Sequence, residues 1–177
     1  MKQLIIIAFF VLQILSGYSQ NVTVTSPNNK ISVELINEQN TNVGEWCLKV
    51  NYINNDKTSE AIPRIDLGLL RNDQEFSKEL KFLKADKPLR INEQYIMLLG
   101  KRTECSNSAN QIIVNFENLN KSKLNLIIRA YNDGLTFRYE FSEKEGTFII
   151  KDELTSYNIP SSTKRLIEKW DMSNEAP

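Results

Sequence analysis

The amino-acid sequence predicts an all-β protein, built as a large antiparallel β-sandwich. Short runs of alternating apolar and polar residues recur along the chain, which is the pattern of strands with one buried face. Clusters of Asn, Asp, Gly and Pro separate these runs, as turn residues do. No long stretch has an apolar spacing that suits a helix and not a strand, and an antiparallel sandwich accounts for the whole pattern.

The first nineteen residues are expected to form a secretory signal peptide. Lys2 supplies a basic start, an apolar run covers Leu4–Leu15, and small and polar residues close the segment at Ser16–Ser19. The alternative is a membrane anchor, but this apolar run is shorter than the ~20 residues that span a bilayer. We expect cleavage between Ser19 and Gln20 and export, to the periplasm, of one domain of residues 20–177.

Charge gives no sign of a nucleic-acid or membrane partner. The chain has 22 basic and 22 acidic residues, and removing residues 1–19 takes away only Lys2. The mature chain then has 21 basic and 22 acidic residues, a net charge near −1. Because basic and acidic residues are nearly equal in number, the charge favours neither nucleic acid nor an anionic membrane surface as a partner.

The first half of the mature chain is predicted to contain six strands. The first two, on either side of the turn at Ser26–Asn29, should form a hairpin or lie as adjacent strands, and Trp46 should lie on the buried face of the third. The segment from Glu75 also suits a helix, but its surroundings favour a strand. The expected strands are Val22–Thr25, Ile31–Ile36, Trp46–Ile53, Ile65–Leu70, Glu75–Leu83 and Tyr95–Leu99.

The second half centres on a hairpin at Leu124–Phe141. Asp133-Gly134 between two alternating runs is a strong hairpin signal, and Gly134 is expected to close the turn with positive φ. A polar loop at Gly100–Asn110 is predicted before the hairpin. The other expected strands are Gln111–Phe116, Gly146–Lys151 and Leu154–Tyr157.

Composition excludes several kinds of catalysis by these residues. Histidine is absent from all 177 residues, which excludes Ser-His and Cys-His nucleophiles and metal sites built on histidine. No Gly-rich phosphate-binding motif occurs. The 22 carboxylates make a chance pair at glycosidase spacing inevitable, so their number decides nothing.

Residues 128–141 read IRAYNDGLTFRYEF, which resembles the signature R-x-Y-x-D-G-x-x-F-R-Y-x-F of the N-terminal domain of glycoside hydrolase family 97. That family contains α-glucosidases and α-galactosidases of carbohydrate-degrading bacteria. The resemblance extends over roughly residues 22–160. Three further segments agree with it in order and spacing: Ser26–Lys30, Gly100–Arg102 and Asp152–Thr155.

The resemblance implies a super-sandwich of the galactose-mutarotase type, followed by a catalytic (β/α)₈ barrel that carries the catalytic acids. The sequence reaches Pro177 before any alternating βα pattern, so we expect the barrel to be absent, the sandwich to be partial at its C-terminal end and no catalytic residue in this chain. Residues that bind the substrate are left unassigned. The implied partners are the barrel itself and, through the full enzyme, an α-glucoside or α-galactoside.

The resemblance also implies a calcium ion near the active site, held largely by glutamates, one of them from this domain. Glu175 is the only acid late enough in the chain to be considered. Calcium needs six to eight oxygen ligands, so this chain alone is not expected to bind it tightly. A solvated acid near the C terminus is the interpretation that we favour for Glu175.

Several other residues allow both a functional and a structural interpretation. Asp133, Arg129 and Arg138 would form a sugar-binding or docking surface, or else support the turn and the outer face of the hairpin, which we favour. Trp46, Tyr157 and Trp170 could stack on sugar rings, although Trp46 has the spacing of a core residue. Cys47 and Cys105 could pair in an exported protein, but we favour two separate thiols.

Two functions remain open from the sequence. The first is the non-catalytic N-terminal domain of an exported α-glycoside hydrolase, which binds carbohydrate and supports the barrel. The second is a stand-alone exported sandwich that binds a glycan or a protein partner. An exposed apolar docking face would favour the first, because a stand-alone module has no such face to cover.

Overall fold

The computed structural model describes residues 22–166, apart from residues 38, 40, 56, 100, 144, 145 and 165. The described part is all β, as predicted, and none of it forms a helix capable of crossing a membrane. The expected signal peptide, Trp170 and Glu175 lie outside the described residues. The strands are β1 (Val22–Thr25), β2 (Ile31–Ile36), β3 (Val43–Gly44), β4 (Cys47–Asn54), β5 (Lys57–Asp66), β6 (Leu69–Arg71), β7 (Glu75–Phe76), β8 (Leu80–Ala85), β9 (Leu89–Ile96), β10 (Glu104–Glu117), β11 (Lys123–Tyr131), β12 (Leu135–Phe141), β13 (Ile150–Glu153) and β14 (Ser156–Asn158).

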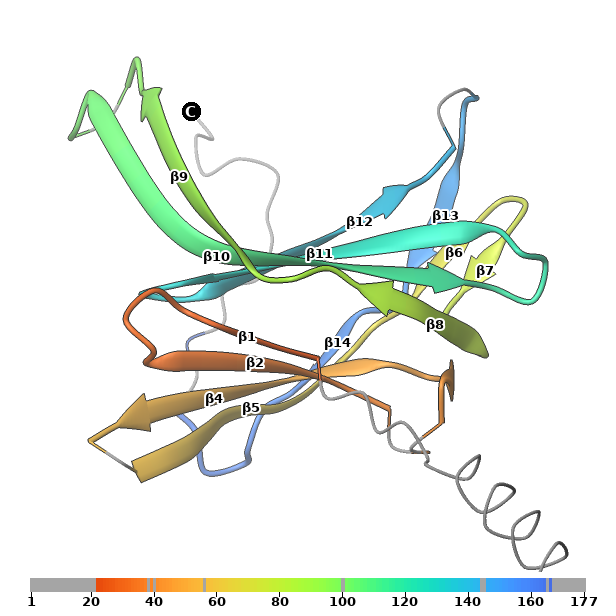
Figure 1. Ribbon diagram of the computed structural model, residues 1–177, viewed down its shortest axis with the longest axis horizontal. Coiled ribbons are helices and arrows are strands. Elements are labelled where there is room, and N and C mark those ends of the chain that lie inside the picture. Colours follow the sequence, from red (N-terminus) through yellow and green to blue (C-terminus); the bar gives the residue numbers. More distant parts are fainter. Residues whose placement is uncertain are drawn as a thin grey trace, which may run out of the picture.

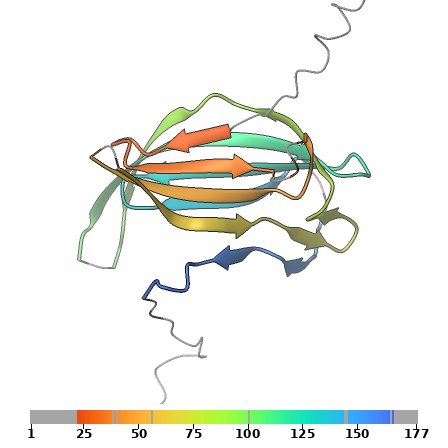
Figure 2. The same cartoon turned by 90° about the horizontal axis from the view of Figure 1, so that it is seen from below.

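Two antiparallel sheets form the layers of a sandwich (Figure 1). The first has the strand order β1-β2-β4-β5-β14. The second has the order β12-β11-β10-β8-β3, and β9 also pairs with β10. A small sheet, β13-β6-β7, lies beside them. Figure 2 shows the same layers seen from below.

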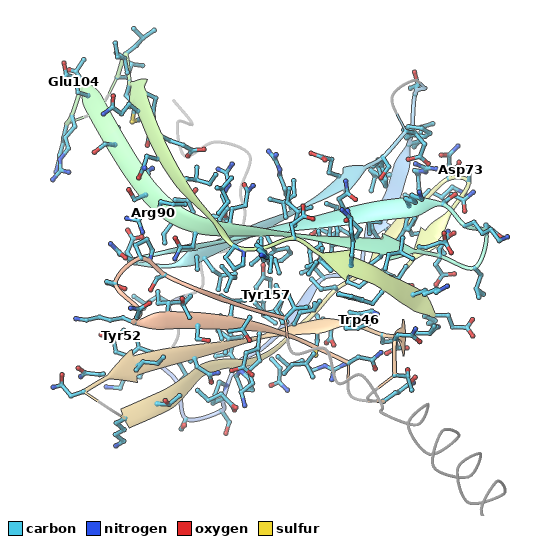
Figure 3. The ribbon with its side chains drawn as sticks, in the orientation of Figure 1. Trp46, Tyr52, Asp73, Arg90, Glu104 and Tyr157 are labelled. Atoms are coloured by element: carbon cyan, nitrogen blue, oxygen red, sulfur yellow. The ribbon has the colours of Figure 1, made fainter. Side chains whose placement is uncertain are left out.

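The core lies between the two layers and comes from the alternating strands. Its largest fully buried side chains include Phe76, Phe116, Leu48 and Ile65. Trp46 is only 5% exposed and its ring lies 5.3 Å from that of Phe116. The prediction that Trp46 is a core residue is therefore confirmed, and Figure 3 shows its place between the layers.

Strands with strong apolar alternation were correctly predicted. β1 and β2 form the opening hairpin, and β11 and β12 form the central one, with Ala130 paired to Leu135 beside the turn. The segment Glu75–Leu83 is extended, as favoured, but a bend at Ser77–Glu79 divides it into β7 and β8.

Other expected boundaries were wrong. The predicted loop Gly100–Asn110 is largely strand, because β10 begins at Glu104 and pairs with β9. β9 itself begins at Leu89 and ends before the expected strand does. The predicted strand Ile65–Leu70 is interrupted at Leu67 and Gly68, where the chain passes from β5 into β6. Towards the C terminus, β13 and β14 begin later than expected.

The part of β5 before Ile65 was missed because it is mostly polar and contains Pro63. Its register with β4 shifts where Pro63 lies, since Leu48 pairs with Ile65 while Val50 pairs with Ile62. One more residue therefore lies on β5 than on β4 between these pairs, as in a β-bulge. A bulge is one of the few places in a sheet that accept proline, which has no N–H to donate.

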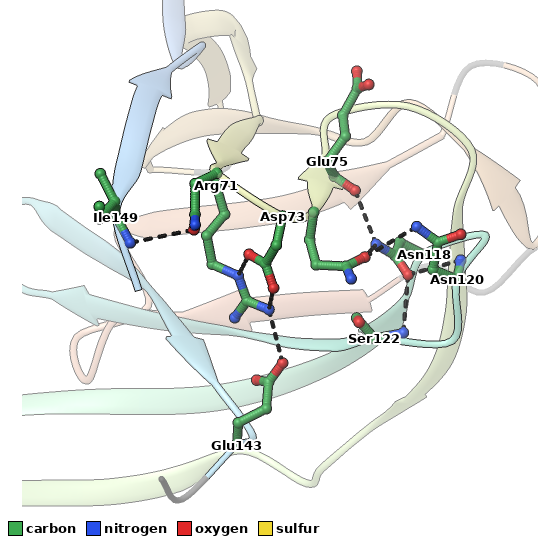
Figure 4. A network of polar contacts seen from close by, with 10 residues as sticks. Arg71, Asp73, Glu75, Asn118, Asn120, Ser122, Glu143 and Ile149 are labelled. Carbon is green, nitrogen blue, oxygen red and sulfur yellow. Dashed lines mark hydrogen bonds and ion pairs between the residues drawn. The ribbon is translucent and has the colours of Figure 1, made fainter. Parts of the chain in front are cut away.

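A buried arginine joins the small sheet to the end of β12 (Figure 4). The side chain of Arg71 is 2% exposed and its guanidinium donates to both carboxylate oxygens of Asp73, at 2.6 and 3.0 Å, and to Glu143 at 3.0 Å. The same group lies 3.9 Å from the ring centre of Phe148 and 4.6 Å from that of Phe141. We call these five residues the Arg71 cage. Burial acts to lower the pKa of Arg71, but the two carboxylates outweigh it and raise that pKa.

Beside the cage, Asn118 organises the turn between β10 and β11. Its amide donates to Gln74 Oε1 at 2.9 Å and to the carbonyl oxygen of Glu75 at 3.2 Å. Its Oδ1 accepts the backbone N–H groups of Asn120 and Ser122 (Figure 4). One buried side chain therefore joins this turn to β7.

Stability is expected to fall in acid through carboxylates held by arginines. The hydrogen bond from Arg71 lowers the pKa of Asp73 below its usual 3.8. Burial acts to raise the pKa of Asp66, but Ser156 and Arg64 outweigh it and lower that pKa too. Their contribution is therefore fully present above pH 3.8 and is lost as pH falls through the lower folded-state values.

Urea unfolding measured from neutral pH down to about pH 2 would check this expectation. Asp73→Asn should flatten the acid limb of the curve. Asp152→Asn, which removes an exposed carboxylate from β13, is the matched control and should keep the wild-type limb. An unchanged acid limb in Asp73→Asn would contradict the prediction.

Candidate functional site

Two of the segments that carry the family resemblance meet in space. The turn between β1 and β2 contains Asn28, whose backbone N–H donates to Asn132 Oδ1 at 2.9 Å. Asn110 of β10 donates its amide to the carbonyl oxygen of Thr25 at 2.7 Å. The two turns are thereby held at one end of the sandwich, which we call the signature end.

The first of these turns is rigidly built. Ser26 is fully buried, and its hydroxyl donates to Asn28 Oδ1 at 2.7 Å and accepts the N–H of Ile31 at 2.9 Å. Asn29 takes the left-handed conformation, with φ of 59°. Asparagine tolerates this conformation better than most residues. The turn therefore presents the backbone of Asn28 to Asn132 in a fixed position.

A polar pocket of about 350 Å³ opens at the signature end. β10 contributes hydroxyl and amide groups, the end of β11 contributes a phenol, and the turn that follows contributes an amide and a carboxylate. Together these groups both donate and accept hydrogen bonds, as the hydroxyls of a sugar require. The lining residues are Ser106, Asn107, Ser108, Tyr131, Asn132 and Asp133.

Arg129 supports the pocket from the outer face of the sheet. Its Nε donates to Gln111 Oε1 and its Nη1 to Glu93 Oε1, both at 2.7 Å, and Nη1 lies 3.5 Å from the hydroxyl of Tyr131. Contact with Tyr131, and then with Glu93, raises the pKa of Arg129 against the opposing effect of burial. The geometry agrees with the structural interpretation of Arg129. Arg138 is exposed, 3.8 Å from Glu140, while Asp133 faces the pocket.

The remaining segments of the resemblance lie elsewhere. Thr155 is 3.1 Å from the hydroxyl of Tyr139, which also accepts the N–H of Gly68 at 3.0 Å. Burial, first of all, raises the pKa of Tyr139. Lys101 and Arg102 lie between the paired parts of β9 and β10 and do not line the pocket, and Gly100 is outside the described residues. These two segments of the resemblance therefore do not take part in the contacts at the signature end.

The expectation for Gly134 was wrong. The N–H of Tyr131 donates to the carbonyl oxygen of Gly134 at 2.8 Å, so the bend falls on Asn132 and Asp133 instead. Among the described glycines, Gly44 and Gly146 have positive φ and Gly134 does not. The turn therefore does not depend on glycine at this position.

We consequently expect Gly134→Ala to be tolerated. A Cβ built at Gly134 meets nothing within 4 Å, and a methyl group reduces the freedom of the unfolded chain. The free energy of unfolding should stay unchanged or rise by about 0.4–1 kcal/mol. Thermal unfolding would test this, with Gly44→Ala as the contrasting variant. Gly44 has φ of 156°, and a Cβ there would lie 2.9 Å from side-chain atoms of Asn37 and Gln39. A large loss of stability in Gly134→Ala would contradict the expectation.

A second, more apolar cleft of about 580 Å³ follows the edge of β12. It lies between β12 and the strands β4, β5 and β14 of the other sheet. Tyr52 and Tyr157 are half exposed at it (Figure 3), and Phe137 also lines it. Of the aromatic residues considered for stacking on sugar rings, Tyr157 is therefore exposed enough to contact a ligand, whereas Trp46 is buried.

The described residues do not provide a metal centre. They contain no group of three or more His, Cys, Asp or Glu side chains that could hold an ion. Cys47 lies on β4 and Cys105 on β10, in different sheets, and they are not joined to each other, as favoured. The donors required for the implied calcium are therefore not found in the described part of the chain, and Glu175 is outside it.

The sequence did not point to Ser106, Asn107, Ser108 or Tyr131 as site residues. The first three were expected in a loop because their stretch lacks apolar alternation. The available signal was the absence of Gly and Pro from residues 101–110, which is unusual for a loop of that length. Their meeting with the turn depends on the pairing of β10 with β11, which places Ala109 opposite Tyr131.

The model of the family described as "Glycosyl-hydrolase 97 N-terminal" matches residues 24–177. The chain belongs to this family. The resemblance that rests on residues 128–141 is therefore confirmed, together with the sandwich fold. No curated protein matches the chain.

Solved structures agree with this membership of the GH97 N-terminal family. A β-arabinopyranosidase is 26% identical with a TM-score of 0.67, over 80% of this chain and 22% of that one. A family 97 enzyme from Pseudoalteromonas sp. strain K8, solved with panose and with acarbose, is 23% identical with a TM-score of 0.64, over 79% of this chain and 20% of that one. The GH97 N-terminal chain thus spans about a fifth of each of these enzymes.

Proposed function

We propose that this chain is the non-catalytic N-terminal domain of an exported α-glycoside hydrolase, and that it supports a catalytic (β/α)₈ barrel. The observation that carries the proposal is the match to the N-terminal family together with coverage of about a fifth of the matched enzymes. The substrate would be an α-glucoside or an α-galactoside. Panose and acarbose, bound by the Pseudoalteromonas enzyme, are in keeping with a carbohydrate ligand.

The signature end is the part of the domain that we assign to carbohydrate. Hydroxyl, amide and carboxylate groups converge there from β10 and from the β11–β12 turn. The network around Arg129 holds Tyr131 in place, so the groups are arranged before a ligand arrives. In the full enzyme this pocket would contribute to one wall of the substrate cleft.

Catalysis and calcium binding are assigned to the rest of the enzyme. Glycoside hydrolysis needs two carboxyl groups at a set separation across the scissile bond, and calcium needs six to eight oxygens. Glu175 remains the candidate for a single calcium ligand from this chain. The leader Met1–Ser19 would direct the protein to the periplasm.

Residues 20–177 should therefore be inactive on aryl α-glucosides and α-galactosides, with or without calcium. Calcium-stimulated turnover by this chain would contradict the non-catalytic assignment. Panose added to ¹⁵N-labelled protein should shift the amide signals of Tyr131–Asp133 at about millimolar concentration, which corresponds to about −4 kcal/mol. Asp133→Ala should abolish these shifts, and the exposed Asp86→Ala should not.

The same titration addresses the stand-alone alternative. A free module that has evolved to hold a glycan by itself should bind panose or another glycan with micromolar affinity and remain monomeric. An absence of shifts at the signature end, at any panose concentration, would remove the pocket from the proposal while leaving the family membership intact.

A further inference from the structure

A two-stranded ribbon extends from the sandwich and is covered by neither sheet (Figure 1). β9 pairs with the first half of β10, from Leu89 opposite Gln111 to Ile96 opposite Glu104. β9 pairs with no other described strand. Figure 3 shows Arg90 near the base of this ribbon and Glu104 near its far end. We call residues 89–99 and 101–111 the arm.

The far end of the arm is strongly apolar and open to solvent. Leu98 is 95% exposed and Leu99 85%, and they follow Ile96 and Met97, which are also exposed. An isolated two-stranded ribbon is only marginally stable in water. Consecutive exposed apolar residues at its end therefore mark a surface that another molecule or domain covers.

We infer that the end of the arm, Ile96–Leu99, docks on the catalytic domain of the same enzyme. This inference rests on the proposed function, because it requires that domain to be present. The matched enzymes are about five times longer than their aligned part, so a neighbouring domain on the same chain is the nearest available partner. Docking would bury the four apolar side chains and hold the arm in its extended form.

Charge supports this partner over a second copy of the chain. Lys101 and Arg102 are exposed directly after the apolar residues. A twofold dimer through the arm would place the same cations of two copies close together, which opposes association. The apolar end also lacks the hydrogen-bonding groups that a sugar would need.

The test uses residues 20–177 co-expressed with the Pseudoalteromonas family 97 enzyme from which the matching N-terminal segment has been removed. That enzyme's own N-terminal segment, supplied separately, is the positive control for a competent partner. Binding is measured by co-purification and by interferometry. Each variant is first checked for a cooperative thermal transition, which exposed positions should preserve.

The double variant Leu98→Asp/Leu99→Asp should weaken binding at least tenfold. Leu119→Asp is the matched control, since Leu119 is 71% exposed but lies in the turn between β10 and β11, and it should bind as the wild type does. Equal binding by the double variant would overturn docking through the arm and leave the proposed function standing. If the control segment binds and this chain does not, both the docking and the barrel-supporting function fail. If the wild-type chain dimerises and the double variant is monomeric, the arm binds a second copy of the chain, and docking on the catalytic domain is overturned.

Discussion

Replacing Trp46 with alanine is expected to lower the free energy of unfolding by about 3–5 kcal/mol. The ring packs against those of Phe82 and Phe116, at centroid distances of 5.7 and 5.3 Å. Its Nε1 donates to the carbonyl oxygen of Leu80 at 2.8 Å. Alanine would leave a cavity between these rings and an unpaired carbonyl group in the core.

The effect should be large because Trp46 connects the two layers. It immediately precedes β4, in the first sheet, while Leu80 begins β8 in the second. Urea unfolding followed by circular dichroism gives the measurement. Trp46→Phe keeps most of the apolar contact and loses the hydrogen bond, so it should cost less than alanine. A loss below about 1 kcal/mol for Trp46→Ala would show that the core does not need this ring.

Removing the cation of the Arg71 cage should cost about 3 kcal/mol. Arg71→Ala deletes the stacking on Phe141 and Phe148 and leaves Asp73 and Glu143 facing each other without a cation. The two carboxylates are partly exposed, so water compensates for part of the loss. The estimate is therefore at the lower end of the range for breaking a buried ion pair.

The comparison of three variants separates charge from shape. Arg71→Lys keeps the charge but cannot donate to both oxygens of Asp73 or stack as a flat group, so it should recover only part of the stability. Arg138→Ala removes an exposed arginine and should change the free energy of unfolding by less than about 0.5 kcal/mol. Full recovery by lysine would mean that the geometry of the cage is unimportant.

Sequence reasoning succeeded where one face of a strand is buried. The alternation of Leu124, Leu126 and Ile128 predicted β11 and its inner face, and all three are buried. It failed on β5 and on the first part of β10, whose side chains are mostly polar and exposed. These strands are held by hydrogen bonds to a neighbour, and backbone hydrogen bonds leave no trace in side-chain polarity.

The signature end shows a second limit of prediction. Its motif residues could be named from the sequence, but not their contact, since Asn28 and Asn132 approach each other only once both sheets are in place. The error at Gly134 has a similar cause. An Asp-Gly pair is compatible with several hairpin turns, and the pairing of Ala130 with Leu135 selects one that bends at Asn132 and Asp133.

The hydrogen bond between Asn28 and Asn132 also has a consequence for folding kinetics. It joins residues 104 positions apart, whereas the hairpins β1–β2 and β11–β12 form from neighbouring segments. Contacts of such separation form late, after the loss of chain entropy on loop closure. Asn132→Ala should therefore speed unfolding while leaving the folding rate nearly unchanged, as stopped-flow measurements in urea would show. The bond would then stabilise the folded sandwich without contributing to the rate-limiting step of folding.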